Sequence, residues 1–276
     1  RGVKYQDIKG HETIERIIMV NQSSIGKNSR SCPATYIDLM PIIRDFYAGL
    51  TESKARGYDK SRFSFNLRGG RCEACKGMGT KKIEMSFLPQ LEVQCSVCGG
   101  KRYNSETLNV KYKGLSIADL LGLTASEAHD FFKNIPFLAK KINLLNEVGL
   151  GYLKLGQSSV TLSGGESQRI KLCKELSRIS SKPTLYALDE PTIGLHFDDI
   201  QKLINVFYSL IVKGNTIVVI EHNPEIIKAA DYIIDLGPGG GYKGGHILYQ
   251  GTLTGIMDCH QSITSGFLKK QLKNAV

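Results

Sequence analysis

The sequence of 276 residues predicts an α/β protein that carries a small cysteine-containing insert. After residue 159, amphipathic helical segments alternate with short β-branched strands, which is the pattern of an α/β sheet. Residues 51–114 differ, because they are rich in Gly, Lys, Arg and Cys and contain only short strand-like pieces. Apolar residues make up 41% of the chain, a usual value for a protein with a packed core.

The expected elements follow the hydrophobic pattern in chain order. In the first part we expect a buried strand at 14–20, a polar loop at 21–31, a helix at 36–50, a strand at 82–85 and helices over 116–148 interrupted by Pro136. In the second part we expect a helix bearing Leu172, Leu176 and Ile179, a helix over 200–211 closed by Gly214, and strands at 184–188, 216–220, 232–236 and 246–249.

Charge and composition restrict the function classes. The net charge is +10, and the segment from Lys54 to Arg102 holds eleven Lys or Arg against four Asp or Glu. Such a concentration favours an anionic partner such as nucleic acid. No run of 18 apolar residues and no secretory signal occur, so we expect a cytoplasmic protein without a membrane partner. The first residue is Arg1, and we therefore expect a piece of a longer chain.

One run in the last third has the pattern of a phosphate-facing helix start. Ser163 and Glu166 have the spacing of a capping box, and Gly164 and Gly165 let a backbone approach a ligand. A helix N-terminus attracts phosphate. Taken alone, Ser-x-x-Glu predicts only a capped helix. The whole run Leu-Ser-Gly-Gly-Glu-Ser-Gln-Arg, which includes Gln168, matches the signature motif of ATP-binding-cassette (ABC) ATPases.

Polar residues follow three expected strands. Asp189 and Glu190 end the strand at 184–188, where one carboxylate would hold Mg²⁺ and the next would orient or deprotonate water. His222 follows the strand at 216–220, and Gln22 follows the first strand. This order matches the ABC motifs known as Walker B, switch histidine and Q-loop. We therefore expect ATP and Mg²⁺ as ligands, with Glu190 and His222 catalytic.

The phosphate-binding loop of such ATPases is missing from these residues. No Gly-x4-Gly-Lys-Ser/Thr occurs, and in the nearest run, Gly26-Lys27-Asn28-Ser29, Asn21 stands at the position of the first glycine. We expect the loop upstream of Arg1. Whether ATP binds without it stays open.

Two cysteine pairs indicate a metal site. Cys72, Cys75, Cys95 and Cys98 form C-x2-C-x19-C-x2-C, which suits structural Zn²⁺ better than a redox pair or a disulfide. The basic residues around them predict contacts to DNA phosphates, and we select Lys60, Arg62, Arg68, Arg71, Lys101 and Arg102. The interleaved aromatic residues either stack on bases or pack the insert, and these are Phe63, Phe65, Phe87 and Tyr103.

Together these motifs resemble the UvrA family of damage-sensing ATPases in bacterial nucleotide excision repair. The resemblance rests on Ser-Arg-Phe-Ser-Phe-Asn at 61–66, Gly-Gly-Arg-Cys-Glu-Ala-Cys at 69–75, Lys-Ile-Glu-Met-Ser-Phe-Leu-Pro at 82–89, Gly-Lys-Arg-Tyr-Asn at 100–104 and Gly-Leu-Gly-Tyr at 149–152. It implies a partial P-loop NTPase-like ABC core with an inserted helical signature region and a zinc module.

The resemblance also implies partners. UvrA-like proteins carry two ABC modules, dimerise, bind damaged double-stranded DNA and pass lesions to UvrB, whose contacts we place outside these residues. Excision-nuclease and SOS-response roles come with that family. In such an arrangement Ser163, Gly164 and Gly165 would cap a nucleotide held by the other module, whereas Gln22, Asp189, Glu190 and His222 would serve the nucleotide of the missing loop.

The chain divides by these features into four expected parts. They are an N-terminal core part with the Q-loop at 1–50, the basic zinc module at 51–115, the helical signature region at 116–182 and the C-terminal core at 183–276. Two alternatives remain. The nucleotide-binding subunit of a transporter would not need the cysteine insert, and a DnaJ-type chaperone module would not account for the last 120 residues.

Overall fold

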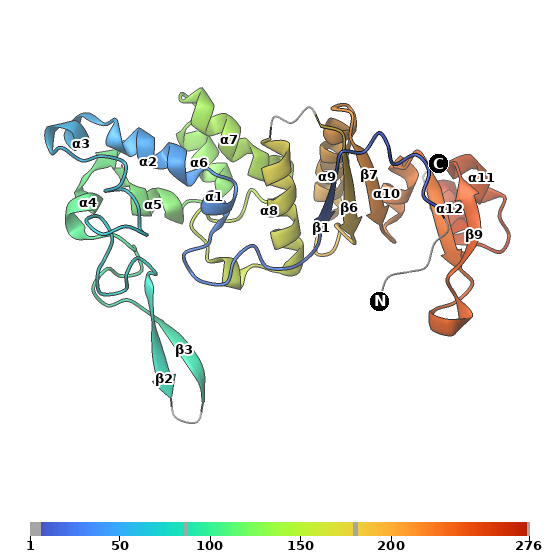
Figure 1. Ribbon diagram of the computed structural model, residues 1–276, viewed down its shortest axis with the longest axis horizontal. Helices are drawn as coiled ribbons and strands as arrows, with labels where there is room; N and C mark the ends of the chain where they lie inside the picture. Colours follow the sequence, from blue (N-terminus) through green and yellow to red (C-terminus); the bar gives the residue numbers. More distant parts are fainter. Residues whose placement is uncertain (1–6, 86–87, 179–181, 275–276) are drawn as a thin grey trace.

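The computed structural model describes residues 7–85, 88–178 and 182–274. The molecule is elongated (Figure 1). Helices α1 to α8 gather at one end, a three-stranded sheet with α9 and α10 lies in the middle, and a β-hairpin with α11 and α12 forms the other end. The β2–β3 hairpin projects away from the helical end.

A parallel sheet forms the middle of the molecule. It has the order β1-β6-β7, with β1 (Arg16–Val20), β6 (Thr184–Asp189) and β7 (Thr216–Ile220). Val20 is paired with Leu188, and Leu188 with Val219, so the three strands end at the same edge. β-Branched and apolar residues fill all three strands, as expected for a parallel sheet. The strands predicted at 14–20, 184–188 and 216–220 are confirmed.

One face of this sheet is covered by helices. α9 (Phe197–Ile211) packs beside β7 and buries its apolar stripe, which includes Ile200, Leu203 and Phe207. Its C-terminal Gly214 has φ +85° and donates its N–H to the Ile211 carbonyl. α8 (Gly164–Leu176) contacts β1 and α1. The predicted helix at 200–211 is therefore confirmed. Of the three residues predicted to lie on the preceding helix, Leu172 and Leu176 lie on α8, and Ile179 lies outside the described residues.

The opposite face of the sheet is apolar and exposed. Ile17 and Met19 on β1 and Val218 and Ile220 on β7 are each more than half exposed. The register places Met19, Ala187 and Val218 in one row. Because strands of a parallel sheet are usually covered on both faces, this surface is unusually apolar for solvent.

The helical end is built from short capped helices. They are α1 (Pro33–Tyr36), α2 (Met40–Ala48), α3 (Thr51–Ala55), α4 (Ser105–Asn109), α5 (Ile117–Gly122), α6 (Ala125–Phe131) and α7 (Pro136–Glu147). Ser116 with Asp119 and Thr124 with Glu127 form capping boxes that begin α5 and α6. Pro136, predicted to interrupt a helix, occupies the first turn of α7, where its missing N–H costs nothing.

Small sheets complete the fold. β2 (Thr80–Met85) and β3 (Leu88–Gln94) form the projecting antiparallel hairpin, and β4 (Lys111–Tyr112) pairs with β5 (Leu115–Ser116). The strands expected at 232–236 and 246–249 exist as β8 (Ile233–Gly237) and β9 (His246–Gly251). They pair antiparallel with each other rather than with the parallel sheet.

Three helices border the small core of this C-terminal hairpin. They are α10 (Pro224–Ala229), α11 (Leu253–Met257) and α12 (Ile263–Asn274). The first of them, α10, also contacts α9 beside the parallel sheet. Ile233, Ile256 and Leu268 form a separate small core beneath them. Among the described residues no helix is long and apolar enough to cross a membrane.

Candidate nucleotide-binding edge and metal centre

The carboxyl ends of the three parallel strands bring the predicted nucleotide residues together. Gln22 follows β1 by two residues, Asp189 ends β6 and Glu190 follows it, and His222 follows β7 by two residues. The Nε2 atom of His222 lies 3.5 Å from Oε1 of Glu190. The His222 side chain is 85% exposed and that of Glu190 38%, so both groups are accessible to a ligand.

Glu190 has an unusual backbone. Its φ of +44° lies in the left-handed region, which non-glycine residues rarely adopt. The Glu190 N–H donates to the Ile220 carbonyl at 2.9 Å, so the turn stays fixed to β7. This bond fixes the turn at the sheet edge, where the Glu190 carboxylate lies beside His222.

Gln168 connects two of the strand ends. Its Nε2 donates to the carbonyl oxygens of Val20 at 2.8 Å and Asp189 at 2.9 Å. The side chain is fully buried, and its Oε1 has no hydrogen-bond partner among the described residues. Gln168, predicted to bind nucleotide, thus lies beneath the edge and holds β1 and β6 to α8; its contact with nucleotide stays a prediction.

The N-terminus of α8 lies next to the Q-loop. The Ser163 hydroxyl accepts from the Glu166 N–H, and the Glu166 carboxylate accepts from the Ser163 N–H at 2.7 Å, so the capping box forms. A side chain at Gly164 would meet Gln22 at 3.0 Å, and one at Gly165 would meet the Ile193 carbonyl at 2.7 Å. A side chain at position 165 would therefore clash with the backbone, whereas one at position 164 would require Gln22 to shift by a few tenths of an ångström.

Lys171 fixes the residues on either side of Gln22. Its ammonium group donates to the carbonyl oxygen of Asn21 at 2.9 Å, to Asn21 Oδ1 at 2.7 Å and to Ser23 Oγ at 2.7 Å. Burial lowers the pKa of Lys171. The sequence pattern did not indicate this residue, since a lysine on a helix face is usually solvated.

Glu221 is a second residue that sequence reasoning missed. Its carboxylate accepts from the backbone N–H of Thr192 at 2.8 Å, His222 at 2.9 Å and Asn223 at 3.0 Å. It thereby joins the loop after Glu190 to the loop that carries His222. Its position directly before His222 was the only available signal.

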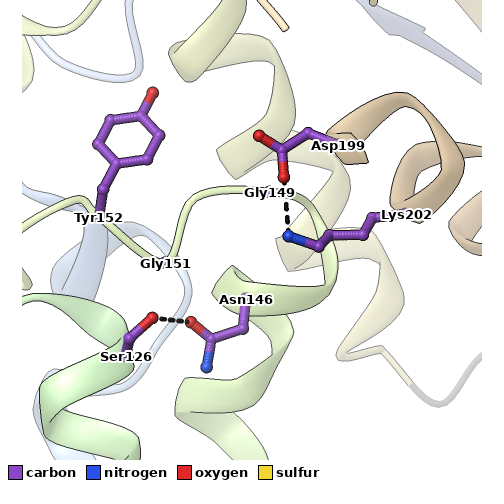
Figure 2. A pocket seen from close by; sticks show the side chains of 7 residues that line it. All are labelled: Ser126, Asn146, Gly149, Gly151, Tyr152, Asp199 and Lys202. Carbon is purple, nitrogen blue, oxygen red and sulfur yellow. Dashed lines mark hydrogen bonds and ion pairs between the residues drawn. The ribbon is translucent and has the colours of Figure 1, made fainter. Parts of the chain in front are cut away.

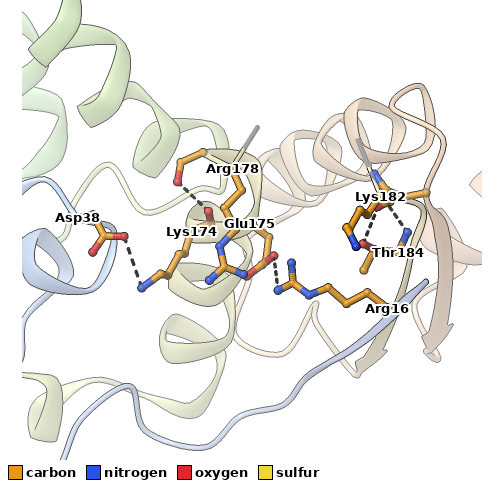
Figure 3. Close-up of polar contacts among 9 residues, drawn as sticks. Arg16, Asp38, Lys174, Glu175, Arg178, Lys182 and Thr184 are labelled. Carbon is orange, nitrogen blue, oxygen red and sulfur yellow. Dashed lines mark hydrogen bonds and ion pairs between the residues drawn. The ribbon is translucent and has the colours of Figure 1, made fainter. Parts of the chain in front are cut away.

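Ion pairs hold the other end of α8. Figure 3 shows Glu175 between Arg16 on β1 and Arg178, at 3.4 and 2.6 Å. Lys174 pairs with Asp38 at 3.5 Å on the helical side. The N-terminal half of α8 is thus bound to the sheet through Gln168, and its C-terminal end through Glu175. Lys174 also binds this C-terminal end to the helical part.

A small pocket borders the start of α8. It has a volume of about 230 Å³ and is lined by Ser126, Asn146, Gly149, Gly151, Tyr152, Asp199 and Lys202 (Figure 2). Its polar groups are largely paired, because Lys202 binds Asp199 at 2.8 Å and Ser126 binds Asn146 at 3.0 Å. The Tyr152 hydroxyl donates to Glu166 Oε1 at 2.8 Å, which connects the pocket wall to the capping box.

The four cysteines of the insert form one cluster. Their Sγ atoms lie within 4.8 Å of one another, and those of Cys75 and Cys98 are 3.7 Å apart. A tetrahedral zinc site with Zn–S bonds of about 2.3 Å requires S···S distances of about 3.8 Å. The N–H groups of Cys98 and Val97 lower the pKa of the Cys95 thiol, whereas burial raises the pKa of Cys72 and Cys98, so it is the spacing of the four sulfurs that indicates a metal site. The donor set therefore fits Zn²⁺.

Three of the six predicted DNA-contacting residues are held within the protein. Arg62 binds Glu106 and Thr107, Arg71 binds both carboxylate oxygens of Glu73 at 3.0 Å, and Arg102 binds the Gly156 carbonyl at 3.0 Å. The other three have exposed side chains, namely Lys60, Arg68 and Lys101. These three are the better placed to contact a nucleic acid.

The aromatic residues of the insert pack it together. Phe63, Phe65 and Tyr103 are 2% exposed or less, and the Tyr103 hydroxyl donates to the Phe63 carbonyl. The sequence left open whether these aromatic residues stack on bases or pack the insert, and for these three the structure shows packing. Phe87 lies outside the described residues.

Comparisons with known proteins agree with this arrangement. The chain is 58% identical over 270 residues to UvrABC system protein A of Rickettsia bellii, and 54% identical to those of Aquifex aeolicus and Salmonella typhimurium. These matches cover 97–98% of the chain but only 28–29% of each relative. The structure of UvrA2 from Deinococcus radiodurans superposes with a TM-score of 0.86 at 45% identity, covering 95% of this chain and 32% of that one. No family model matches.

The fold and the site define a class. A parallel sheet whose edge carries Gln22, Asp189, Glu190 and His222, next to the capped helix α8, has the fold of part of an ABC ATPase core. Within that class the cysteine module and the sequence matches are specific. The chain is UvrA-like along nearly its whole length, and it spans under a third of the length of the relatives it matches.

Proposed function

We propose that this chain acts in DNA-damage recognition during nucleotide excision repair, as the ABC portion of a UvrA-like protein that couples ATP to DNA binding. The observation that carries the proposal is the sheet edge, where Glu190 and His222 lie 3.5 Å apart and Gln22 follows β1 next to Gly164 at the start of α8. A transporter subunit would use the same edge, but it has no need of the four-cysteine module or of the basic residues around it. The chaperone alternative leaves the edge without a role.

In this proposal the edge serves the terminal phosphate of ATP. Asp189 would hold Mg²⁺, since its carboxylate makes no hydrogen bond or ion pair with other described residues. Glu190 orients the attacking water and accepts its proton. His222 would contact the terminal phosphate, and Gln22 would contribute a polar group from the loop after β1. The protein contributes position and charge, which is most of what phosphoryl transfer requires.

The phosphates themselves need a P-loop, which these 276 residues do not contain. We propose that another polypeptide segment supplies it. The apolar sheet face with Ile17, Met19, Val218 and Ile220 supports this, because a covering segment would bury it. Ser163, Gly164 and Gly165 at the start of α8 would cap a nucleotide held by a second ABC module, either in the same protein or in a dimer partner.

The cysteine module would bind one structural Zn²⁺ and hold the exposed cations toward double-stranded DNA. All four ligands come from the protein, so the metal leaves no open position for catalysis. A UvrB-like partner would bind outside these residues. A cytoplasmic location and an SOS-response link accompany this proposal.

Steady-state ATP hydrolysis tests the proposal. The chain is assayed alone and mixed with the P-loop segment of a UvrA relative, with and without duplex DNA. We expect turnover only in the mixture, abolished by Glu190→Gln and unchanged by Glu147→Gln, an exposed carboxylate on α7. Turnover by the chain alone that survives Glu190→Gln would contradict the assigned edge. Turnover without any response to DNA would favour an ABC ATPase outside repair.

A further inference from the structure

A second pocket lies where the cysteine module meets the helical part. It has a volume of about 200 Å³ and is lined by Gly100, Lys101, Arg102, Ala118, Leu121, Gly122, Lys154, Gly156 and Gln157. The Gly100–Arg102 segment directly follows the second cysteine pair. The wall opposite belongs to α5 and to the loop that leads toward Ser163. The pocket therefore joins the two parts that the proposed function requires to communicate.

Three cations line this pocket. Lys101 pairs with Asp119 at 3.7 Å, and both side chains stay partly exposed. Lys154 is exposed and forms no ion pair among the described residues, although the pKa of the exposed Glu127 is lowered by hydrogen bonds from Thr124 and, to a smaller extent, by the charge of Lys154. Arg102 has no carboxylate partner among the described residues. The positive charge of the pocket is thus only partly compensated, as expected of an anion site.

Arg102 gives an independent indication of a missing ligand. Its Nη2 donates to the Gly156 carbonyl at 3.0 Å, and its guanidinium lies 5.1 Å from the centre of the Phe65 ring. Its Nη1 is buried and has no hydrogen-bond partner in the described part of the chain. An unsatisfied buried N–H of a charged group is costly, and such groups call for a water or an ion. A ligand oxygen would satisfy it.

The shape restricts the ligand to one that offers a compact oxyanion. The backbone N–H groups of Lys101, Gly156 and Gln157 already bond to carbonyls, so the available donors are side chains. The lysine and arginine side chains suit the oxygens of a single phosphate group. The pocket is too small for a base pair and offers no exposed aromatic ring for stacking.

We propose that this pocket binds one backbone phosphate of the nucleic acid, with Lys154 and Lys101 as the contacting cations and Arg102 completing the site. The inference rests on the proposed DNA binding and adds a contact at Lys154, which lies outside the basic run around the cysteines. A phosphate there would link the module to the loop that leads into the signature helix. Free phosphate or a nucleotide offers the same chemistry and has to be distinguished by experiment.

The test uses the zinc-loaded 276-residue chain, a labelled 30-base-pair duplex and fluorescence anisotropy at several KCl concentrations. The variant is Lys154→Gln, and the matched control is Lys133→Gln, another exposed lysine of the helical part. Loss of one phosphate contact lowers the slope of log K against log salt by about one, which corresponds to about 8-fold weaker binding at 0.1 M salt. We expect this change for Lys154→Gln and not for the control.

A second arm separates the sources of phosphate. Inorganic phosphate is titrated into ¹⁵N-labelled chain while the Gly156 and Gln157 amide resonances are followed. Saturable shifts in the wild type that Lys154→Gln removes support the phosphate site. Such shifts together with unchanged DNA binding in Lys154→Gln overturn the nucleic-acid assignment in favour of a free anion. If neither measurement responds to Lys154→Gln, the pocket proposal is wrong. If the wild type does not bind DNA, both the proposed function and the proposal of a nucleic-acid phosphate in this pocket are wrong.

Discussion

His222 Nε2 and Glu190 Oε1 lie 3.5 Å apart, although they belong to loops that follow different strands. The imidazole is 85% exposed, so the contact adds little to stability. Their proximity comes instead from the register of β6 and β7 and from the Glu221 carboxylate, which fixes the backbone on both sides. A left-handed backbone at Glu190 beside two exposed functional groups costs stability, and such a cost is typical of a place where a ligand binds.

Replacing His222 separates function from stability. We expect His222→Ala to change the free energy of unfolding by no more than about 0.5 kcal/mol, because the side chain is exposed. ATP turnover in the mixture with a P-loop segment should fall roughly 100-fold, since a group that stabilises the transferred phosphate is lost. Urea unfolding and steady-state turnover measure the two effects. A large loss of stability with normal turnover would show that His222 is structural.

Replacing Gln168 should reduce the stability of the fold. Gln168→Leu leaves the carbonyls of Val20 and Asp189 without their buried donor, and each unsatisfied group costs about 1–3 kcal/mol. We expect a loss of about 2–4 kcal/mol in the free energy of unfolding, read from urea denaturation. Gln201→Leu on the exposed side of α9 is the control and should stay near wild type. Equal effects of the two variants would contradict the role of Gln168 as a link between strands.

The cysteine cluster predicts a defined metal content. The purified chain should carry one zinc ion, measured by mass spectrometry of the metal, and Cys75→Ser should lose it. Cys259→Ser replaces a cysteine of the turn between α11 and α12 and should retain full zinc. In the metal-free variant the Gly79 amide, which donates to Cys75 Sγ at 3.3 Å, should exchange its proton faster. Retention of zinc by Cys75→Ser would exclude the tetrahedral four-sulfur site.

Acid should weaken the cap of α5. Burial alone would raise the pKa of Asp119, but the hydroxyl and N–H of Ser116 and the charge of Lys101 outweigh it and lower that pKa. A carboxyl whose pKa is lower in the folded state stabilises the fold above its unfolded value and stops doing so as pH falls through the folded value. Urea midpoints between roughly pH 6 and pH 3 should therefore decline less steeply for Asp119→Asn than for wild type. Asp198→Asn is an exposed control and should follow the wild-type curve. If Asp119→Asn also follows the wild-type curve, the charge of Asp119 does not stabilise the cap of α5.

Local patterns in the sequence predicted much of the fold and of the site. The strands before Gln22, Asp189 and His222 are apolar and β-branched, and strand ends in an α/β fold meet at one edge. The capping box of Ser163 and Glu166 and the cysteine spacing are likewise local. These features depend on neighbours within a few residues, which the sequence displays directly.

Features that depend on distant neighbours were not visible. The sequence shows β8 and β9 as strands but not which strand each one pairs with. Arg62 reads as a free cation, whereas Glu106, 44 residues further along the chain, binds it in the fold. Lys171 acts on a loop 150 residues away. In each case the partner is chosen by packing rather than by chain proximity.

The left-handed backbone at Glu190 lowers the stability of the fold but keeps a carboxylate at the sheet edge. An L-residue with a side chain pays roughly 1–2 kcal/mol in that conformation, whereas glycine adopts it freely. Glu190→Gly should therefore leave the protein at least as resistant to unfolding while it removes the carboxylate at the sheet edge. A screen that rewards only thermal robustness would favour this substitution, and a screen that rewards turnover would reject it. Position 190 is thus one where thermostability engineering and catalytic competence select different residues.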